Sequence, residues 1–336
     1  IRERLERLRE ELRREHLSAF VFPTSDPHHS EYTADHWKGR EWISGFNGSA
    51  GTAVVTLTSA ALWTDSRYFI AAEEQLRGTE YLLMRIKVDG TPTIAEWLGK
   101  ELADMDDKAV GIDGMVNTTA EVESLKAELR KRGGITLRTN FDPLQRVWRD
   151  RPSIPMSPVG IYPLEYAGET CREKLTRIRR ALAAQHADGM LVVALDDIAW
   201  TLNLRGSDVH CNPVFVSYLL IASHKATLFI DPKKVSDKVR AYLQGEGVDV
   251  APYTDVEKGL QDYFEYNILL DPEEVCYTLY QKATRTVVNG TSPIAAMKAV
   301  KNEREIAGFR LAMLRDGIAM VKFLKWLDEH VTTEPL

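Results

Sequence analysis

The sequence predicts an α/β protein built from two consecutive domains of the same kind. Three observations carry this prediction: short apolar strands alternate with amphipathic helices, the order of elements repeats in the second half, and a proline-rich segment separates the halves. At 336 residues the chain is also too long for one ordinary core, so two or three domains are expected.

The first half opens on a helix, "IRERLERLREELRREHL", because Leu5, Leu8 and Leu12 recur on one stripe at helical spacing. Its Arg and Glu residues are typical of a solvated face. The elements expected next are a buried strand at 18–22, a polar loop at 23–40, two hairpin strands at 52–57 and 60–65, and a helix starting at Ser66, which lies near its cap.

The remainder of the first half keeps the alternation of strands and helices. The segments in order are "YLLMRIK", "TPTIAEWLGKEL", "AVGID", "TTAEVESLKAELRKRG" and "ITLRT". Four prolines, at 152, 155, 158 and 163, then occur without helical periodicity, and prolines at that density favour extended backbone. We therefore predict a first domain at 1–150 and a Pro-rich linker at 151–168.

The second half repeats the first. "REKLTRIRRALAAQHADGMLVVAL" has the opening helix and strand, and "NPVFVSYLLIASHKATLFID" has the hairpin, which again ends in an Asp after an apolar strand. The opening strand and the Asp after the hairpin are each separated from their counterpart in the first half by nearly the same number of residues, which favours tandem homologous domains over a short-period repeat array. The second domain is placed at 169–301.

From Asn302 the sequence predicts one long amphipathic helix, which starts a third unit at 302–336. Apolar residues lie near helical spacing in "EREIAGFRLAMLRDGIAMVKFLKWLDEHV", so the apolar face of this helix needs a partner. The expectation is that the chain stops just as this third unit begins.

Composition excludes some functions. With 44% hydrophobic and 27% charged residues the chain is typical of a globular protein, and its net charge of −6 argues against binding duplex nucleic acid. No apolar run is long enough to span a membrane. Cys171, Cys211 and Cys276 are widely spaced and form no CxxC pair, which fits reduced, structural cysteines. A cytoplasmic location is expected, also because no apolar signal-like segment opens the chain.

The glycine-rich stretch "SGFNGSAGTAVV" raises the possibility of a nucleotide loop. A dinucleotide fingerprint needs a strand before the glycines and a helix after them, whereas here a strand follows. The P-loop pattern also fails, because no Lys-Ser/Thr pair follows Gly51. A tight, close-packed turn into a sheet is the better interpretation.

Three polar segments are candidates for a site. "SDPHHSEY" contains His28 in a cluster that lacks metal-ligand spacing, so it is expected to face a ligand or another domain. "WTDSRYF" places Asp65 and Arg67 at a strand-to-helix junction, where ligands commonly bind in α/β domains, although a capping Asp and a structural ion pair are an equal alternative. "NLRGSDVHCNPV" is interpreted first as a packed polar turn.

Together these segments resemble the N-terminal portion of cytosolic three-domain Xaa-Pro aminopeptidases, which are pita-bread metallopeptidases related to creatinase and prolidase. The residues that carry the resemblance occur in the order found in the family: "PTSDPHHSEY", "FNGSAGTAVV", "LWTDSRYF", "VWRDRP", "LDDIAWTLNLRGSDVHCNPV", "LFID" and "MKAVKNEREIAGFR". The resemblance implies two creatinase-like N-terminal domains with mixed sheets flanked by helices, followed by the first helix of a pita-bread catalytic domain.

The resemblance also implies an activity, the removal of an N-terminal residue that precedes proline. In the family two divalent ions, usually manganese, activate the attacking water, and their Asp, His and Glu ligands lie in the pita-bread domain. The expectation is therefore that this chain contains no catalytic residue, binds no metal and is inactive alone. Arg67 matches a position that reaches the peptide cleft, and His28 and Asp65 are further candidates for substrate binding. The implied partners are short peptides with proline second and, for the full-length form, a second copy.

Two alternatives stay open. Some pita-bread relatives have lost their metals and act as peptide- or protein-binding modules. Creatine amidinohydrolase is the other alternative, although two tandem N-terminal domains favour the peptidase. The metal ligands of the C-terminal domain would distinguish an enzyme from a binding module.

Overall fold

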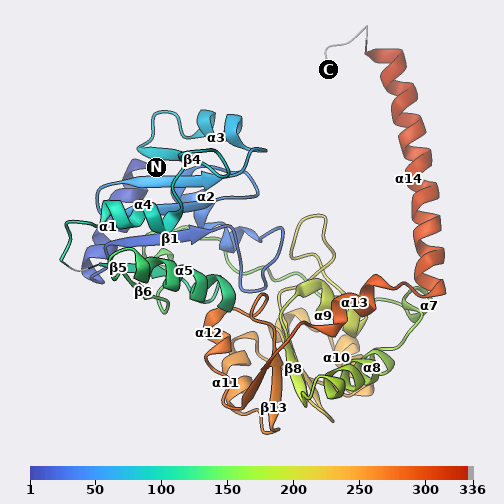
Figure 1. Cartoon of the computed structure of the whole chain (residues 1–336). Helices are drawn as coiled ribbons and strands as arrows, with labels where there is room; N and C mark the ends of the chain where they lie inside the picture. Colours follow the sequence, from blue (N-terminus) through green and yellow to red (C-terminus); the bar gives the residue numbers. More distant parts are fainter. Residues whose placement is uncertain (107, 332–336) are drawn as a thin grey trace.

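The computed structural model describes residues 1–106 and 108–331. Residues 332–336 of the predicted third unit lie outside the described residues. Two α/β domains lie one above the other, and a long helix leaves the second domain and extends past the first (Figure 1).

The first domain is a six-stranded mixed sheet in the order β4-β3-β2-β1-β5-β6. Strands β1, β2 and β3 pair antiparallel, and β4, β5 and β6 are added in parallel. The elements are α1 (Arg2–Arg14), β1 (Ala19–Pro23), the 3-10 turn η1 (Asp35–Trp37), α2 (Gly39–Ser44), β2 (Thr52–Thr56), β3 (Ala60–Thr64), α3 (Phe69–Gln75), β4 (Tyr81–Arg85), α4 (Ile94–Glu101), β5 (Ala109–Ile112), α5 (Thr119–Lys131), β6 (Thr136–Arg138) and α6 (Leu144–Val147).

The second domain has the same sheet. Its order, β12-β11-β10-β8-β13-β14, repeats the first strand by strand and with the same pairing directions. The elements are β7 (Gly160–Ile161), α7 (Leu164–Ala167), α8 (Cys171–Ala184), β8 (Gly189–Val192), α9 (Leu195–Leu202), β9 (Leu204–Arg205), β10 (Tyr218–Ile221), β11 (Ala226–Phe229), η2 (Pro232–Lys234), α10 (Asp237–Glu246), β12 (Val248–Ala251), η3 (Tyr253–Asp255), α11 (Val256–Gln261), β13 (Asn267–Leu270), α12 (Tyr277–Tyr280), β14 (Thr286–Asn289) and α13 (Pro293–Ala299).

The repeat extends to backbone detail. His16 after α1 and His186 after α8 both adopt a left-handed conformation, with φ of 54° and 57°, although this region is uncommon for residues other than glycine. Each histidine ends the helix that leads into the first strand of its sheet. The predicted duplication is therefore confirmed in both topology and turn geometry.

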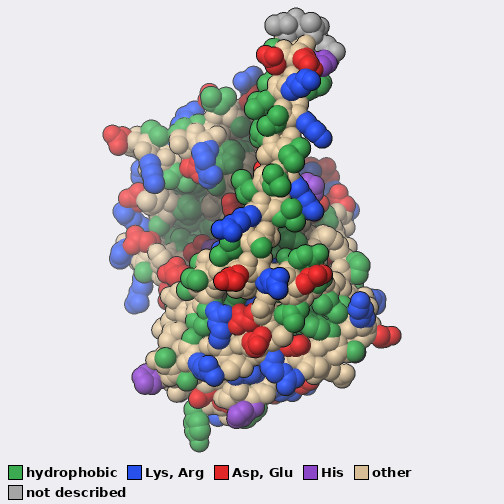
Figure 2. Space-filling model, turned by 90° about the vertical axis from the view of Figure 1, so that its right-hand side faces the viewer, with side chains coloured by type: hydrophobic (Ala, Val, Ile, Leu, Met, Phe, Trp, Pro, Cys, Tyr) green, Lys and Arg blue, Asp and Glu red, His purple; other side chains and the backbone are tan. Residues whose placement is uncertain are grey.

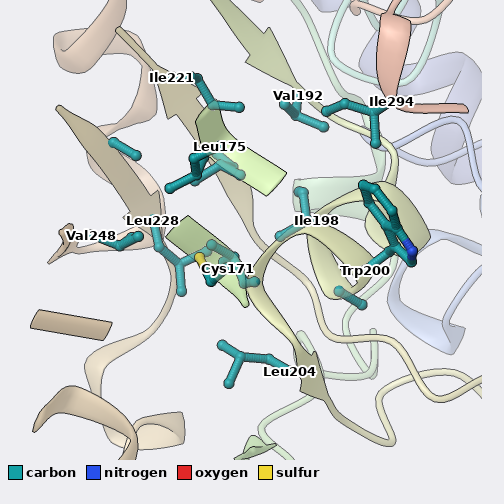
Figure 3. Close-up of a cluster of buried hydrophobic side chains, with 14 of the residues drawn as sticks. Cys171, Leu175, Val192, Ile198, Trp200, Leu204, Ile221, Leu228, Val248 and Ile294 are labelled. Carbon is teal, nitrogen blue, oxygen red and sulfur yellow. The ribbon is translucent and has the colours of Figure 1, made fainter. Parts of the chain in front are cut away.

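Helices cover both faces of each sheet, so alternate residues of the central strands enter two different cores. In β1, Phe20 and Phe22 pack with the leucines of α1, whereas Ala19 and Val21 pack toward α4 and α5. In the second domain, residues of α8, α9, β8, β10 and β11 form one buried cluster around Leu175 (Figure 3). Burial on both faces explains why these strands read as continuous apolar runs.

Two details differ from the predictions for the first domain. The helix expected from Ser66 begins at Phe69, because the Asp65 carbonyl accepts from the Tyr68 amide at 3.0 Å and closes a turn ahead of the helix. The segment expected to be a polar loop at 23–40 contains η1 and the start of α2. The domain boundaries stay a prediction, and the predicted linker holds β7 and α7, which lie against the second domain.

The last described element, α14 (Glu303–His330), is a single helix of 28 residues, as predicted. At its base Asn302 forms a capping box with Glu305, and the Trp200 Nε1–H donates to Glu305 Oε1 at 3.2 Å. Beyond this base the helix rises above the second domain with apolar side chains exposed along it (Figure 2). None of the described helices is long and apolar enough to cross a membrane.

Candidate functional site

A groove of about 1230 Å³ opens where the two domains meet. The first domain lines it with residues between 31 and 41 and with residues 47–49, the linker contributes residues between 152 and 155, and the second domain contributes residues 207–212. Two of the three polar segments, "SDPHHSEY" and "NLRGSDVHCNPV", and the glycine-rich stretch therefore contribute to one concave surface, whereas "WTDSRYF" does not line it. A concave, partly polar surface between domains is a common place for a ligand.

The glycine-rich segment forms one wall of this groove. Gly45 ends α2 in a left-handed conformation with φ of 79°. A Cβ at Gly48 would lie 2.3 Å from Cζ of Phe46, and one at Gly51 would lie 3.0 Å from the Trp63 carbonyl oxygen. Strand β2 follows directly, with no helix whose N-terminus could bind phosphate. The interpretation as a tight, close-packed entry into the hairpin is confirmed.

Arg40 holds the glycine segment in place. Its guanidinium is buried and donates to the carbonyl oxygens of Phe46 and Gly48, and its Nε donates to Thr24 Oγ1 at 3.0 Å. Burial lowers the pKa of Arg40 to about 10. The sequence analysis missed this residue, because nothing in the local pattern separates a buried Arg from the exposed ones that predominate in proteins.

Arg67 and Asp65 form a two-point ion pair beside the groove. The Nε and Nη2 atoms of Arg67 donate to the two carboxylate oxygens of Asp65 at 3.0 and 2.8 Å. The guanidinium also lies over the ring of Tyr68, 5.2 Å from its centre, and the Tyr68 hydroxyl lies 2.6 Å from the hydroxyl of Ser49 in the groove wall. Arg67 is therefore exposed, at 65%, but oriented by two neighbours.

Charges around this pair reinforce each other. The hydrogen bond from Arg67 lowers the pKa of Asp65, and the bond to Asp65 raises the pKa of Arg67, with a smaller contribution from Glu31 of the groove. The ion pair that the sequence analysis named as one alternative is present, because the two side chains contact each other directly. Both named alternatives, ligand contact and a structural ion pair, fit this geometry.

His28 lies in the domain interface and not on the groove wall. Its side chain is 2% exposed, Nδ1 lies 3.0 Å from the Val193 carbonyl oxygen, and Nε2 lies 2.9 Å from the Tyr253 hydroxyl. Its ring packs 4.5 Å from that of Tyr218. Burial lowers the pKa of His28 from 6.5 to about 4, so the ring is neutral at pH 7. Of the two expectations for its segment, the structure places His28 against another domain.

The second-domain wall depends on a buried ion pair. Asp208 contacts Lys234, and both side chains are almost fully buried. The remaining lone pairs of Asp208 accept from the backbone N–H groups of Val216 at 2.7 Å and Ser157 at 3.2 Å. This arrangement fits the packed polar turn expected for "NLRGSDVHCNPV", and it fixes the loop that carries His210 and Cys211 into the groove.

The three cysteines are free, and two of them are buried. Cys171 and Cys276 are buried, and burial raises the pKa of both thiols to about 12, which fits structural cysteines. Cys211 is exposed in the groove, so its expected structural role is wrong. Among the residues that the structure describes, no group of three or more His, Cys, Asp or Glu side chains could hold a metal ion.

Comparison with known proteins adds the family. The creatinase/prolidase N-terminal domain is matched twice, at residues 4–144 and 150–305. The chain is 37% identical to Xaa-Pro aminopeptidase 1 of Dictyostelium discoideum over 98% of this chain and 54% of that protein. It is 38% identical to a probable Xaa-Pro aminopeptidase P of Sordaria macrospora over 99% of this chain and 56% of that protein.

A solved structure agrees with the whole described arrangement. The X-prolyl aminopeptidase of Caenorhabditis elegans, a cytosolic enzyme with a di-nuclear active site, superimposes with a TM-score of 0.92 at 31% identity, over 98% of this chain and 56% of that one. The chain thus spans about half the length of the relatives it matches. It carries two tandem creatinase/prolidase N-terminal domains and belongs to the family of proteins with this domain, and over both domains it is similar to Xaa-Pro aminopeptidases.

Proposed function

We propose that this chain is the non-catalytic N-terminal portion of an aminopeptidase that cleaves the bond between a first residue and a proline at position 2. Its two domains shape and restrict the cleft in which short peptides are bound. The observation that carries the proposal is the match over 98% of the chain to an X-prolyl aminopeptidase, with both domains and the helix in the same arrangement. Ordinary peptidases handle this bond poorly, because proline lacks an amide hydrogen and restricts its neighbours.

Arg67 is the residue proposed to contact the substrate. It is exposed beside the groove, and its guanidinium is held by Asp65 and Tyr68, so little side-chain freedom is lost on binding. Its planar set of donors suits a carbonyl or carboxylate of a peptide. Asp65 acts on that guanidinium directly, whereas His28 contributes by fixing the two domains.

The metal chemistry belongs to the part of the protein that follows these domains. The worm relative has a di-nuclear active site, and we propose two divalent ions, manganese or similar, for the full-length form of this protein as well. When bound, such a pair generates a nucleophile from water and stabilises the developing charge. The residues of this chain position the peptide and exclude wrong substrates. We further propose a cytoplasmic location and a homodimer for the full-length form.

The test uses the full-length protein and this chain in parallel. With a Xaa-Pro-Pro tripeptide and manganese, the full-length protein is expected to release the first residue, and this chain alone is expected to release none. Manganese-dependent release by this chain would contradict the proposed division of roles. Arg67→Ala in the full-length protein is expected to lower kcat/KM while leaving Tm unchanged, and an unchanged kcat/KM would remove Arg67 from the site.

Proteins with two other functions contain the same kind of domains. A metal-free relative that binds peptides without cleaving them would bind the tripeptide and release nothing. A creatine amidinohydrolase would hydrolyse creatine and leave the tripeptide intact. The same assay, with creatine as a second substrate, therefore separates the three.

A further inference from the structure

The ion pair between Asp65 and Arg67 determines more than the position of a side chain. Both carboxylate oxygens of Asp65 are engaged by the same guanidinium, through Nε and Nη2. Oδ1 accepts in addition from the backbone N–H of Arg67 at 3.0 Å. Asp65 is therefore fixed to Arg67 by three hydrogen bonds within a single turn, and its charge stays beside the guanidinium.

This pairing leaves donors on Arg67 but little net charge. A guanidinium has five N–H groups, and Asp65 engages two of the three nitrogens. Within the part of the chain that the structure describes, Nη1 of Arg67 donates no hydrogen bond. A ligand at this site thus meets a hydrogen-bond donor whose positive charge is balanced by an adjacent carboxylate.

The surrounding charges do not restore a net cation. The charge of Glu31 in the groove wall also acts on Arg67, and the charge of Lys87 acts on Asp65. The four groups comprise two carboxylates and two cations. The Tyr68 ring beneath the guanidinium is held by Ser49 and adds no formal charge while its hydroxyl is protonated.

The charge balance distinguishes two kinds of peptide. In a Xaa-Pro dipeptide the carbonyl carbon of proline belongs to a free carboxylate. In a longer peptide the same atom belongs to a neutral amide. An unpaired Arg stabilises the carboxylate more, because hydrogen bonds between charged groups are roughly twice as strong as neutral ones. An Arg already paired with Asp65 loses most of that preference.

We infer that Asp65 is a specificity-determining residue, which neutralises Arg67 so that the site accepts the amide carbonyl of a longer peptide in preference to the carboxylate of a Xaa-Pro dipeptide. The inference rests on the proposed function, in which Arg67 contacts the peptide. It goes beyond that function by choosing between the carbonyl and the carboxylate as the group that Arg67 binds. It also gives Asp65 a role distinct from capping a helix.

The test compares two substrates that differ in this charge alone, Ala-Pro and Ala-Pro amide, with the full-length protein. Asp65→Asn keeps the size and one acceptor oxygen but removes the charge. It is expected to raise the ratio of kcat/KM for Ala-Pro to kcat/KM for Ala-Pro amide by on the order of fivefold. The increase is expected to shrink at high salt, since exposed charges are screened.

Two further variants make the result specific. Glu73→Gln removes the charge from another exposed pair of the same domain, Glu73 with Arg85 at 2.9 Å, and is expected to leave the ratio unchanged. Asp65→Asn combined with Arg67→Ala is expected to show no increase over Arg67→Ala, because the effect of Asp65 acts through Arg67.

Each other outcome contradicts a definite statement. The inference is overturned if the ratio of the two kcat/KM values in Asp65→Asn stays within twofold of wild type, or if kcat/KM falls equally for both substrates. Asp65 would then only position Arg67, and the proposed role of Arg67 would stand. If Arg67→Ala leaves kcat/KM unchanged for both substrates, the role of Arg67 in the proposed function is wrong, and the inference is wrong with it. Circular dichroism of each variant separates these outcomes from misfolding.

Discussion

His28 of the first domain and Tyr253 of the second share a buried hydrogen bond, with Nε2 and the hydroxyl oxygen 2.9 Å apart. Because the Val193 carbonyl on the other side of the ring can only accept, Nδ1 carries the hydrogen and the neutral ring accepts from Tyr253 through Nε2. Protonation of Nε2 would remove this acceptor and place a charge among aromatic rings. Asp26 and Asp208 favour the charged ring, and Lys234 opposes it, but burial dominates.

The domain interface is therefore expected to weaken in acid. The pKa of His28 is about 4 in the folded protein against an ordinary 6.5, so the unfolded chain takes up the proton first as pH falls. The contribution of the neutral ring to stability is complete above pH 6.5 and is lost between pH 6.5 and 4. The full loss of this contribution lowers the free energy of unfolding by about 3 kcal/mol.

Urea unfolding of wild type and His28→Gln across this pH range measures the effect. Between pH 6.5 and 4 the free energy of unfolding of wild type is expected to fall by up to about 3 kcal/mol more than that of the variant. The exposed His224→Gln serves as the matched control and is expected to follow wild type. Parallel pH profiles for wild type and His28→Gln would show that His28 does not titrate in this way.

Arg40→Met is expected to destabilise the first domain by about 2–4 kcal/mol, since it leaves buried carbonyl oxygens without a donor. The groove wall at residues 47–49 should become more exposed to solvent, and hydrogen exchange of its amides should speed up. Arg85→Met removes a partly exposed Arg of the same domain and is expected to change stability by less than about 0.5 kcal/mol. Equal effects of the two substitutions would contradict the anchoring role of Arg40.

Gly48→Ala tests whether the glycines are needed for close packing. The added Cβ meets the rings of Phe46 and Tyr68, at 2.3 and 2.8 Å, and overpacking of this kind costs about 1–3 kcal/mol. Gly160→Ala, where a Cβ would meet no atom within 4 Å, is the control and should be nearly neutral. Thermal unfolding checks both, and a stable Gly48→Ala protein would mean that the loop has room to adjust.

Asp208→Asn is expected to lower the free energy of unfolding by about 3–5 kcal/mol, because it leaves Lys234 buried without a counter-charge. The exposed pair of Lys225 and Asp249 offers a comparison, in which Asp249→Asn should cost less than about 0.5 kcal/mol. Chemical denaturation measures both values. A loss below about 1 kcal/mol for Asp208→Asn would show that the second-domain wall does not depend on this pair.

The repeated architecture was accessible from the sequence because it is encoded locally. Apolar strand runs, helical spacing and the Asp after each hairpin recur in order, and each signal depends on neighbouring residues. Capping boxes such as Thr93 with Glu96 and Thr118 with Glu121 fix where two of the helices start. The start of α3 was misplaced, because the turn formed by Asp65 uses the same residue types as a helix cap.

The domain interface and the groove were not predictable in the same way. His28 and Tyr253 are far apart in the chain, and their contact depends on how two finished domains dock. Much of the docking also uses backbone groups, such as the Thr119 N–H donating to the Val275 carbonyl at 3.1 Å, which carry no side-chain signal. The sequence therefore identified Arg67 and Asp65 as a local pair but could not place Arg40 in the interior.

The duplication supplies a reference site inside the molecule. In the second domain the Asp after the hairpin, Asp231, accepts from the backbone N–H two residues on, Lys233, at 2.9 Å, just as Asp65 accepts from Arg67 at 3.0 Å. One ancestral turn thus ends in a guanidinium in one copy and an ammonium in the other. The second domain thus keeps the same turn but presents a lysine ammonium, which lacks the planar set of donors of Arg67.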